Sequence, residues 1–173
     1  MPAPEKNIVL VGFMGTGKSS VGKVLAQKLC RPLIDVDSYI EEKEKRKIRE
    51  IFKKDGEAVF RAMEKEAIRL LSFPGGSVMT TGGGAVLDAE NRRVLKGSGI
   101  VVALLAKPET IFERVKNSRN RPLLAGEDML GEIKTLLEQR RPFYQEADLF
   151  FETDGKTPTQ VAEMISAALG QEK

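Results

Sequence analysis

A glycine-rich segment near the start of the chain has the residue types and spacing that suit phosphate binding. Residues 12–19 read GFMGTGKS, which matches the pattern G-x-x-x-x-G-K-[ST]. The segment follows an apolar run and precedes a stretch of helical spacing, so backbone N–H groups and a helix N-terminus would surround phosphate oxygens. Lys18 would reach the β- and γ-phosphates, and the Ser19 hydroxyl would bind Mg²⁺. An ordinary glycine-rich turn is disfavoured by these flanking elements, and we expect a nucleoside triphosphate as ligand.

Two aspartates end the next apolar run, at Asp35 and Asp37 in LIDVD. On extended backbone, residues two apart face the same side, where one carboxylate would serve a metal ion and the other an acceptor hydroxyl. A turn or a helix cap at Asp37 is the structural alternative. Later strands lack the Asp–Glu ending of motor and helicase NTPases, and the chain has no N-K-x-D guanine motif. Next to the phosphate loop, the functional interpretation of the pair is favoured.

A second glycine-rich segment, TGGG at residues 81–84, follows another apolar run. At the end of a parallel strand it would lie on the sheet edge where open α/β folds bind ligands. Three successive glycines, Gly82, Gly83 and Gly84, cost conformational entropy and indicate close approach of the backbone to a ligand. A plain flexible turn is the alternative.

Several arginines could hold anions, because a guanidinium donates paired hydrogen bonds to a carboxylate or a phosphate. Taken singly, each is better explained as a surface cation, and Arg61 has Glu57 and Glu64 at helical spacing for a salt bridge. The residues alone do not choose among the candidates, which are Arg61, Arg114, Arg119, Arg121 and Arg140.

The composition restricts the chemistry further. The 173 residues include no histidine, no tryptophan and one cysteine. Imidazole bases, Ser-His-Asp triads and histidine-ligated metals are therefore excluded. Cys30 alone forms neither an internal disulfide nor a cysteine-rich zinc site, so we expect a reducing, cytoplasmic location. Catalysis must use carboxylates, lysine, arginine, hydroxyls and backbone amides.

Charge and hydropathy argue against two classes of partner. The 28 basic and 25 acidic residues are mostly interleaved, and a net charge of +3 is too small to indicate nucleic-acid binding. The longest apolar runs have strand length and the first residues do not resemble a signal peptide, so no membrane association is expected. The length fits a single domain over residues 1–173, for which a monomer is the default.

Elements that position these residues follow from the hydrophobic pattern, which alternates short apolar runs with helical periodicity. We expect strands at residues 7–12, 32–35, 77–80, 99–105 and 149–152. Helices are expected at 19–29, at 38–71 with a break at 55–56, and at 88–96, 108–115 and 129–145. A last helix is expected from Thr157, where Thr157 is the cap, Pro158 fits the first turn and Gln160 completes a capping box. Residues 117–128 lack a sustained period and predict a loop. The alternation predicts an α/β fold with a parallel sheet covered on both faces.

Taken in order, the motifs resemble one family along nearly the whole chain. GFMGTGKSS, LIDVD, IFKKDGEAVFRAME, TTGGGAV, NRPLLAG and QRRPFYQEAD together resemble the shikimate kinases. The resemblance implies a P-loop NTPase fold of the nucleoside-monophosphate-kinase type, a five-stranded parallel sheet flanked by helices, with a P-loop at 12–19, a substrate-binding helical region at about 38–71 and a lid at about 117–128. It also implies Mg²⁺-dependent transfer of the ATP γ-phosphate to the 3-hydroxyl of shikimate, a step of chorismate and aromatic amino-acid biosynthesis.

The resemblance also implies roles for particular residues. Lys18, Asp37 and Arg121 would be catalytic, with Arg121 the lid arginine that closes on the phosphates. Ser19 would bind Mg²⁺ directly and Asp35 through water. The implied ATP contacts are Gly15, Thr16, Gly17, Lys18, Ser19, Ser20, Arg114, Arg121 and Pro158. The implied shikimate contacts are Asp37, Arg61, Gly82, Gly83, Gly84 and Arg140, the arginines holding the carboxylate.

Three further positions are less specific. Phe52 and Phe60 resemble walls of the substrate pocket and read equally well as core. Lys156 stands where some members have an arginine beside the base, so the resemblance gives it no fixed contact.

Two rival functions share the P-loop. A gluconate-type or nucleotide kinase would not combine TGGG with Arg61 and Arg140 in this pattern. A nucleotide-binding regulatory module without transferase activity gives no reason for Asp35 and Asp37 to coexist with a lid arginine. The leading hypothesis is a Mg²⁺- and ATP-dependent kinase of a small alcohol, of the shikimate kinase type.

Overall fold

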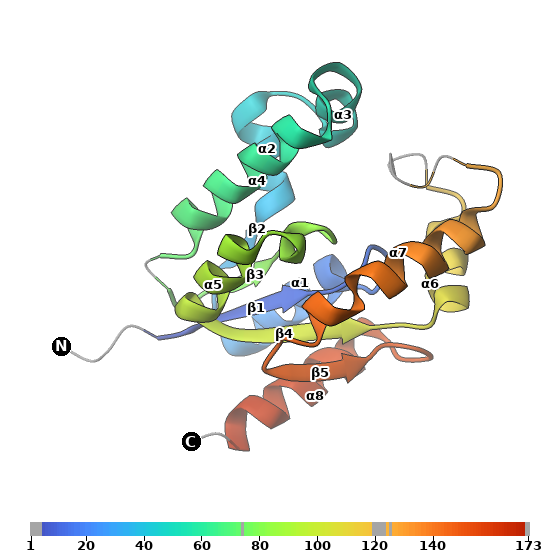
Figure 1. The fold of residues 1–173 in the computed structure, drawn as a ribbon. Helices are drawn as coiled ribbons and strands as arrows, with labels where there is room; N and C mark the ends of the chain where they lie inside the picture. The colour runs from blue at the N-terminus through green and yellow to red at the C-terminus, as the bar shows by residue number, and fades with distance from the viewer. Residues whose placement is uncertain (1–4, 74, 119–123, 125, 172–173) are drawn as a thin grey trace.

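A parallel β-sheet forms the centre of the computed structural model, which describes residues 5–73, 75–118, 124 and 126–171. Over these residues the sheet has five strands in the order β2-β3-β1-β4-β5, and every neighbouring pair is parallel. The strands are β1 (Asn7–Val11), β2 (Leu33–Asp35), β3 (Val78–Thr80), β4 (Gly99–Leu105) and β5 (Leu149–Glu152). The predicted α/β fold class and five-stranded parallel sheet are confirmed (Figure 1).

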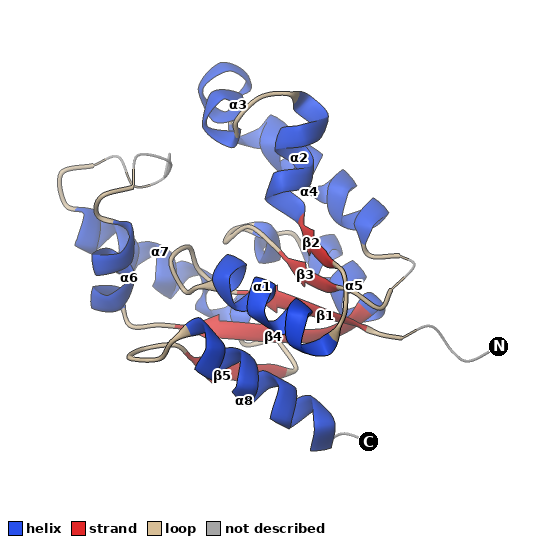
Figure 2. Ribbon diagram, turned by 180° about the vertical axis from the view of Figure 1, so that it is seen from behind, coloured by secondary structure: helices blue, strands red, loops and turns tan. Residues whose placement is uncertain are grey.

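Helices cover both faces of this sheet. Helices α1 and α8 lie together over one face, as Figure 2 shows, and α5 and α7 lie over the other. The helices are α1 (Lys18–Leu29), α2 (Val36–Glu44), α3 (Ile48–Asp55), α4 (Glu57–Leu71), α5 (Ala89–Ser98), α6 (Pro108–Val115), α7 (Met129–Tyr144) and α8 (Pro158–Gln171), with a short 3₁₀ helix η1 (Ala85–Leu87). No helix in the described ranges is long and apolar enough to cross a membrane.

The central strand β1 shows why the sheet needs two covered faces. Ile8 and Leu10 pack into the cluster that includes α1 and α8, whereas Val9 and Val11 pack into the cluster on the opposite face. All four side chains are at most 3% exposed. Since successive side chains of a strand point to opposite faces, a strand buried on both sides must be apolar throughout. The strand ends are thereby held at one edge, where the functional loops emerge.

Helices α2 to α4 extend beyond β2 as a separate group above the sheet (Figure 1). The predicted helix over 38–71 breaks at Asp55 and Gly56 as expected, but it also breaks between Glu44 and Ile48. Lys45 adopts a left-handed conformation with φ 54°, and no glycine or proline stands there to mark the end of α2 in the sequence. The region is therefore three helices instead of two.

Two further details concern the last helix and the predicted loop. The capping box is confirmed, because the Gln160 N–H donates to the Thr157 hydroxyl at 3.2 Å and the Thr157 N–H donates to the Gln160 side chain at 2.8 Å. The described residues of 117–128 belong to no helix or strand, and Leu124 among them is buried in the core. Arg119 and Arg121 lie outside the described residues.

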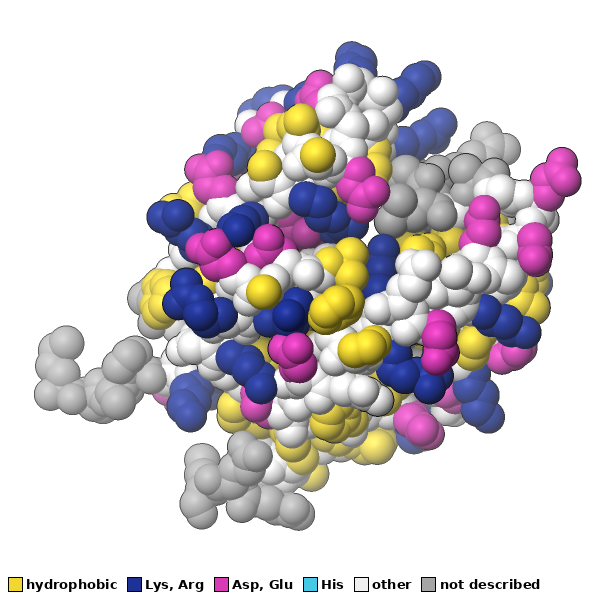
Figure 3. All heavy atoms as spheres, viewed as in Figure 1, with side chains coloured by type: hydrophobic (Ala, Val, Ile, Leu, Met, Phe, Trp, Pro, Cys, Tyr) yellow, Lys and Arg dark blue, Asp and Glu magenta, His cyan; other side chains and the backbone are white. Residues whose placement is uncertain are grey.

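Acidic and basic side chains alternate over the face shown in Figure 3. Lys65, for example, is paired with Asp88 at 3.3 Å and with Glu90 at 2.8 Å. The interleaving of charges in the sequence thus persists on this surface.

Candidate active site

The loop between β1 and α1 has the conformation that its glycines predict. Gly12, Gly15 and Gly17 have φ values of 147°, 77° and 98°, a range that side chains other than glycine rarely adopt. A Cβ on Gly15 would also lie 2.8 Å from the Val115 side chain. Helix α1 begins at Lys18, one residue earlier than predicted. The loop therefore leads directly into a helix N-terminus, the arrangement that binds phosphate.

Lys18 and its neighbours line a cavity of about 580 Å³ at this helix end. The Lys18 ammonium donates to the carbonyls of Gly12 at 2.6 Å and Phe13 at 2.9 Å, and the side chain is nearly buried. The Thr16 hydroxyl donates to the same Phe13 carbonyl at 2.8 Å. The cavity is lined by Met14, Gly15, Gly17, Lys18, Ser19, Ser20, Lys23, Leu33, Asp35, Asp37, Ser38, Thr81, Gly82, Gly83 and Arg114.

The two aspartates line this cavity, but the backbone that carries them differs from the predicted one. Asp35 ends β2 and caps α2, because its carboxylate accepts the Ser38 N–H at 2.7 Å and the Thr80 hydroxyl at 2.6 Å. Asp37 lies in the first turn of α2, so the expected extended backbone between the two residues was wrong. The helix cap is Asp35, whereas the alternative weighed from the sequence placed it at Asp37. Both carboxylates nevertheless line the same cavity.

Asp37 is an unusual carboxylate. Its Oδ1 is shielded from solvent and has no hydrogen-bond partner in the described chain. Burial raises the pKa of Asp37 to about 7, with further increases from the charges of Glu64 and Asp35. Lys18 and Arg61 oppose the increase. A carboxyl with this pKa exchanges its proton near neutral pH, as a group that accepts a hydroxyl proton should.

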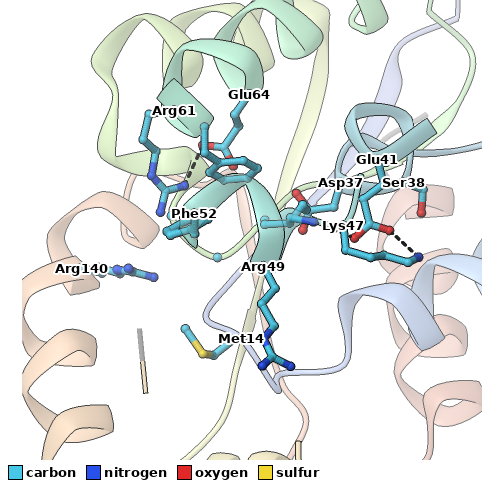
Figure 4. Close-up of a pocket in the computed structure, with 15 residues that line it drawn as sticks. Met14, Asp37, Ser38, Glu41, Lys47, Arg49, Phe52, Arg61, Glu64 and Arg140 are labelled. Carbon is cyan, nitrogen blue, oxygen red and sulfur yellow. Dashed lines mark hydrogen bonds and ion pairs between the residues drawn. The ribbon is translucent and has the colours of Figure 1, made fainter. Parts of the chain in front are cut away.

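A second cavity, of about 490 Å³, adjoins the first. Both cavities are lined by Met14, Asp37, Ser38, Gly82 and Gly83, so they meet at Asp37. Figure 4 shows the side chains of the second cavity, most of which come from α2, α3, α4 and α7, with Met14 from the loop after β1 and Lys47 from the connection between α2 and α3. Its remaining lining residues are Glu41, Lys47, Ile48, Arg49, Phe52, Phe60, Arg61, Glu64, Gly84 and Arg140.

Three arginines line the second cavity, namely Arg49 on α3, Arg61 on α4 and Arg140 on α7 (Figure 4). Arg61 on α4 is paired with Glu64 at 2.8 Å and with Glu57 at 3.2 Å, so the salt bridges considered from the sequence are present. Arg140 on α7 is 3% exposed and lies 5.4 Å from the centre of the Phe13 ring. Its Nη1 is buried without a hydrogen-bond partner among the described residues. A buried guanidinium nitrogen without a partner favours an anionic ligand at this position.

The glycines at 82–84 serve close packing, because none of the three has a positive φ. A Cβ on Gly82 would lie 3.0 Å from the Glu64 carboxylate and 3.1 Å from that of Asp37. On Gly84 it would lie 2.6 Å from the Arg61 guanidinium carbon. The loop follows β3 at the carboxyl edge of the sheet, as predicted, and its bare backbone leaves room for these charged groups.

Glu64 is a site residue that sequence reasoning treated only as a salt-bridge partner. Its carboxylate is fully buried, and Oε2 has no hydrogen-bond partner in the described chain. Burial raises its pKa, and the Arg61 charge opposes this. The spacing of three residues from Arg61 was the available signal. Phe52 and Phe60 line the cavity with ring centres 4.9 Å apart and also pack against the core, so both interpretations hold.

The residues predicted near the adenine lie around one turn after β5. Arg114 donates to the Gly15 carbonyl at 3.0 Å and to the Thr153 carbonyl at 3.0 Å. The Thr153 carbonyl also accepts the Lys156 N–H at 3.2 Å. Pro158 begins α8 and is exposed. Arg114 thus connects the phosphate loop to this turn.

Ser19 and Asp35 suit a hard cation such as Mg²⁺. A hydroxyl and a carboxylate on one cavity wall supply the oxygen ligands that Mg²⁺ prefers. The described residues contain no cluster of three or more acidic, cysteine or histidine side chains that could hold a metal alone.

Comparison with known proteins agrees with this geometry. A family model described as shikimate kinase matches residues 14–170. The shikimate kinase of Thermodesulfovibrio yellowstonii is 49% identical over 160 residues, which cover 92% of this chain and 92% of that protein. The solved structure of shikimate kinase from Acinetobacter baumannii in complex with shikimate has a TM-score of 0.95 at 38% identity, covering 99% of this chain and 96% of that one.

More distant structures share the architecture alone. A gluconokinase from Sinorhizobium meliloti has a TM-score of 0.59 at 19% identity, covering 99% of this chain and 94% of that one. Similarity at this level shows a shared fold only. The family model and the relatives, by contrast, all name shikimate kinase and match nearly the whole chain. The chain belongs to the shikimate kinase family.

Proposed function

We propose that this protein transfers the γ-phosphoryl group of ATP to the 3-hydroxyl of shikimate, giving shikimate 3-phosphate and ADP in the route to chorismate and the aromatic amino acids. The observation that carries the proposal is the contact between two cavities at Asp37. One cavity has a phosphate loop, and the other has a buried arginine suited to a carboxylate. A phosphoryl donor and a hydroxy acid bound in these cavities would meet at this carboxyl.

On the nucleotide side, the loop backbone and Lys18 hold the phosphates. Phosphoryl transfer needs mainly positioning and charge stabilisation, which a nearly buried lysine and oriented N–H groups supply. Bound Mg²⁺ would neutralise charge on the β- and γ-phosphates, with Ser19 as direct ligand and Asp35 holding it through water. The residues in these contacts are Gly15, Thr16, Gly17, Lys18, Ser19 and Ser20, with Arg114 and Pro158 towards the adenine.

On the acceptor side, Arg61 and Arg140 hold the shikimate carboxylate, and the backbone of Gly82, Gly83 and Gly84 lies against the ring. Asp37 accepts hydrogen bonds from ring hydroxyls and takes up the proton of the 3-hydroxyl as the phosphate bond forms. Its raised pKa makes it a stronger proton acceptor than an ordinary aspartate.

The remaining assignments rest on the family resemblance. The 117–128 segment is proposed as a lid that excludes water, with Arg121 closing on the phosphates, although Arg121 lies outside the described residues. A single-domain, monomeric and cytoplasmic enzyme is part of the same proposal.

The test is an assay of ADP release with shikimate, gluconate and nucleoside monophosphates offered in parallel. ADP formation that depends on shikimate is expected, with little release for the other acceptors. Release with gluconate or a nucleotide instead would assign the chain to the rival kinases. No acceptor-dependent release at all would favour a regulatory nucleotide-binding module.

A further inference from the structure

Tyr144 ends helix α7 and is buried behind the wall of the second cavity. Its side chain is 3% exposed, and its hydroxyl donates a hydrogen bond of 2.6 Å to the Gly83 carbonyl, 61 positions earlier in the chain. Burial raises the pKa of Tyr144, and the charge of Arg140, one helical turn earlier on α7, opposes this, so the guanidinium lies near the hydroxyl. One hydroxyl therefore lies beside two of the groups assigned to shikimate.

The hydrogen bond from Tyr144 fixes the glycine loop relative to α7. The Gly82 carbonyl accepts the Ala85 N–H at 3.1 Å, and the Gly84 carbonyl accepts the Leu87 N–H at 3.1 Å, both within the local turn. The Gly83 carbonyl instead reaches across to Tyr144. Glycine backbone has the most conformational freedom to lose, so a loop of three glycines needs such a contact. Because a peptide is planar, holding the Gly83 carbonyl also fixes the direction of the Gly84 N–H.

Arg140 lies in the same part of the cavity wall. Its guanidinium lies over the Phe13 ring, and Tyr144 follows one helical turn later on α7. A Cβ on Gly83 would lie 3.5 Å from Arg140 Nη1, so the loop and the arginine are neighbours in the cavity wall. Without the hydroxyl, each could shift relative to the other.

We propose that Tyr144 is a positioning residue for the acceptor, which sets the spacing between the Gly82–Gly84 loop and Arg140 without touching shikimate. The inference rests on the proposed function. Tyr144 lines a separate cavity, together with Leu137 and Phe150, and is not among the residues that line the acceptor cavity. Burial raises the pKa of Tyr144 to about 12, so its hydroxyl keeps its proton at any assay pH.

The test compares Tyr144→Phe with Tyr39→Phe, since these are the two tyrosines of the chain. Tyr39 packs against the core, and the described residues offer its hydroxyl no hydrogen-bond partner, which makes it a matched control. Tyr144→Phe should raise the shikimate KM about tenfold, the scale of one lost buried hydrogen bond. The ATP KM should stay within about twofold, because Tyr144 makes no hydrogen bond to the described P-loop residues and does not line the nucleotide cavity. Thermal unfolding of both variants is measured alongside.

A double-mutant cycle with Arg140→Ala distinguishes positioning from general stability. If Tyr144 acts partly through Arg140, its replacement should raise the shikimate KM less in the Arg140→Ala background than in the wild type. Additive effects, or an ATP KM that rises in step with the shikimate KM, would overturn the positioning role while leaving the proposed function intact. Absence of shikimate-dependent ADP release in the wild type would overturn the proposed function, and the inference with it.

Discussion

In the nucleotide cavity, one continuous segment from Met14 to Lys23 supplies much of the wall, whereas the acceptor cavity takes its charged groups from α2, α3, α4 and α7 and from Lys47, which precedes α3. The glycines of the two regions differ in the same way. Gly12, Gly15 and Gly17 are needed for positive φ angles. Residues 82–84 have no positive φ; Gly82 and Gly84 leave room for charged side chains, and Gly83 leaves room for the backbone of Met14.

This difference predicts how substitutions in each half of the site should affect binding. A phosphate loop is a local structure, so its damage should alter nucleotide handling first. The acceptor cavity is a tertiary structure, so a change in one wall should displace groups on another. The predictions below test this separation, from the largest expected effect to the smallest.

Replacement of Lys18 tests the nucleotide half. Lys18→Ala should lower kcat by about a thousandfold, because it removes the buried cation that stabilises the transferring phosphate. Calorimetry with shikimate alone should give nearly unchanged affinity. Lys28→Ala, an exposed lysine in the last turn of α1, is the control. A comparable loss of shikimate affinity in Lys18→Ala would show that the halves are not separate.

A glycine-to-alanine substitution should raise the shikimate KM in the acceptor half and the ATP KM in the nucleotide half. Gly84→Ala should raise the shikimate KM about 30-fold, since the new Cβ displaces the Arg61 guanidinium from a charge-paired site. Gly15→Ala should act mainly on the ATP KM, because φ 77° is strained for alanine and Val115 is in the way. Gly97→Ala on α5, where a Cβ meets nothing within 4 Å, is the control for steady-state kinetics. Equal effects of the first two variants on both KM values would contradict the comparison.

Ionised Asp37 should lower the free energy of unfolding as the pH rises through 7. Its pKa is raised from 3.8 to about 7, so the stabilising contribution of the protonated form is complete below about pH 3.8 and lost as pH rises through 7. Asp37→Asn cannot ionise, so its free energy of unfolding at pH 8 should be about 1–3 kcal/mol higher than that of the wild type. The variant should also lose activity. Denaturant unfolding at pH 8 and pH 4 checks this. A stability gain that is as large at pH 4 as at pH 8 would contradict the assignment to Asp37.

The pH dependence of acceptor binding should be smaller. Without nucleotide, shikimate affinity should rise by up to about tenfold between pH 6 and pH 8, as Asp37 loses its proton and becomes a better hydrogen-bond acceptor for ring hydroxyls. Calorimetry at several pH values measures it. Affinity that falls over this range would mean that the protonated form of Asp37 binds shikimate.

The phosphate loop was predictable because all of its signals lie within residues 12–20, between one strand and one helix. The sheet was predictable for a related reason, since strands buried on both faces are apolar throughout. For the acceptor cavity, the motifs alone placed Asp37 and the glycines 82–84 near a ligand, but the choice of Arg61 and Arg140 came from the family resemblance, because these parts are far apart in the chain.

What escaped prediction depends on tertiary contacts. The role of Asp35 as a helix cap depends on where α2 begins, and the end of α2 at Lys45 has no glycine to mark it. Glu64 and Tyr144 look like ordinary helix residues until the fold buries one beside Arg61 and places the other against Gly83. Neither residue type nor spacing reveals a contact across 61 positions.

The central claim is that a pocket assembled from distant segments recognises shikimate while the P-loop binds ATP. Calorimetric titration of shikimate into Arg140→Ala tests it most directly, with ATP titrated in parallel. Removing the buried guanidinium should weaken shikimate binding by about 2–4 kcal/mol and leave ATP affinity unchanged. Wild-type shikimate affinity in Arg140→Ala would contradict the assignment of this pocket.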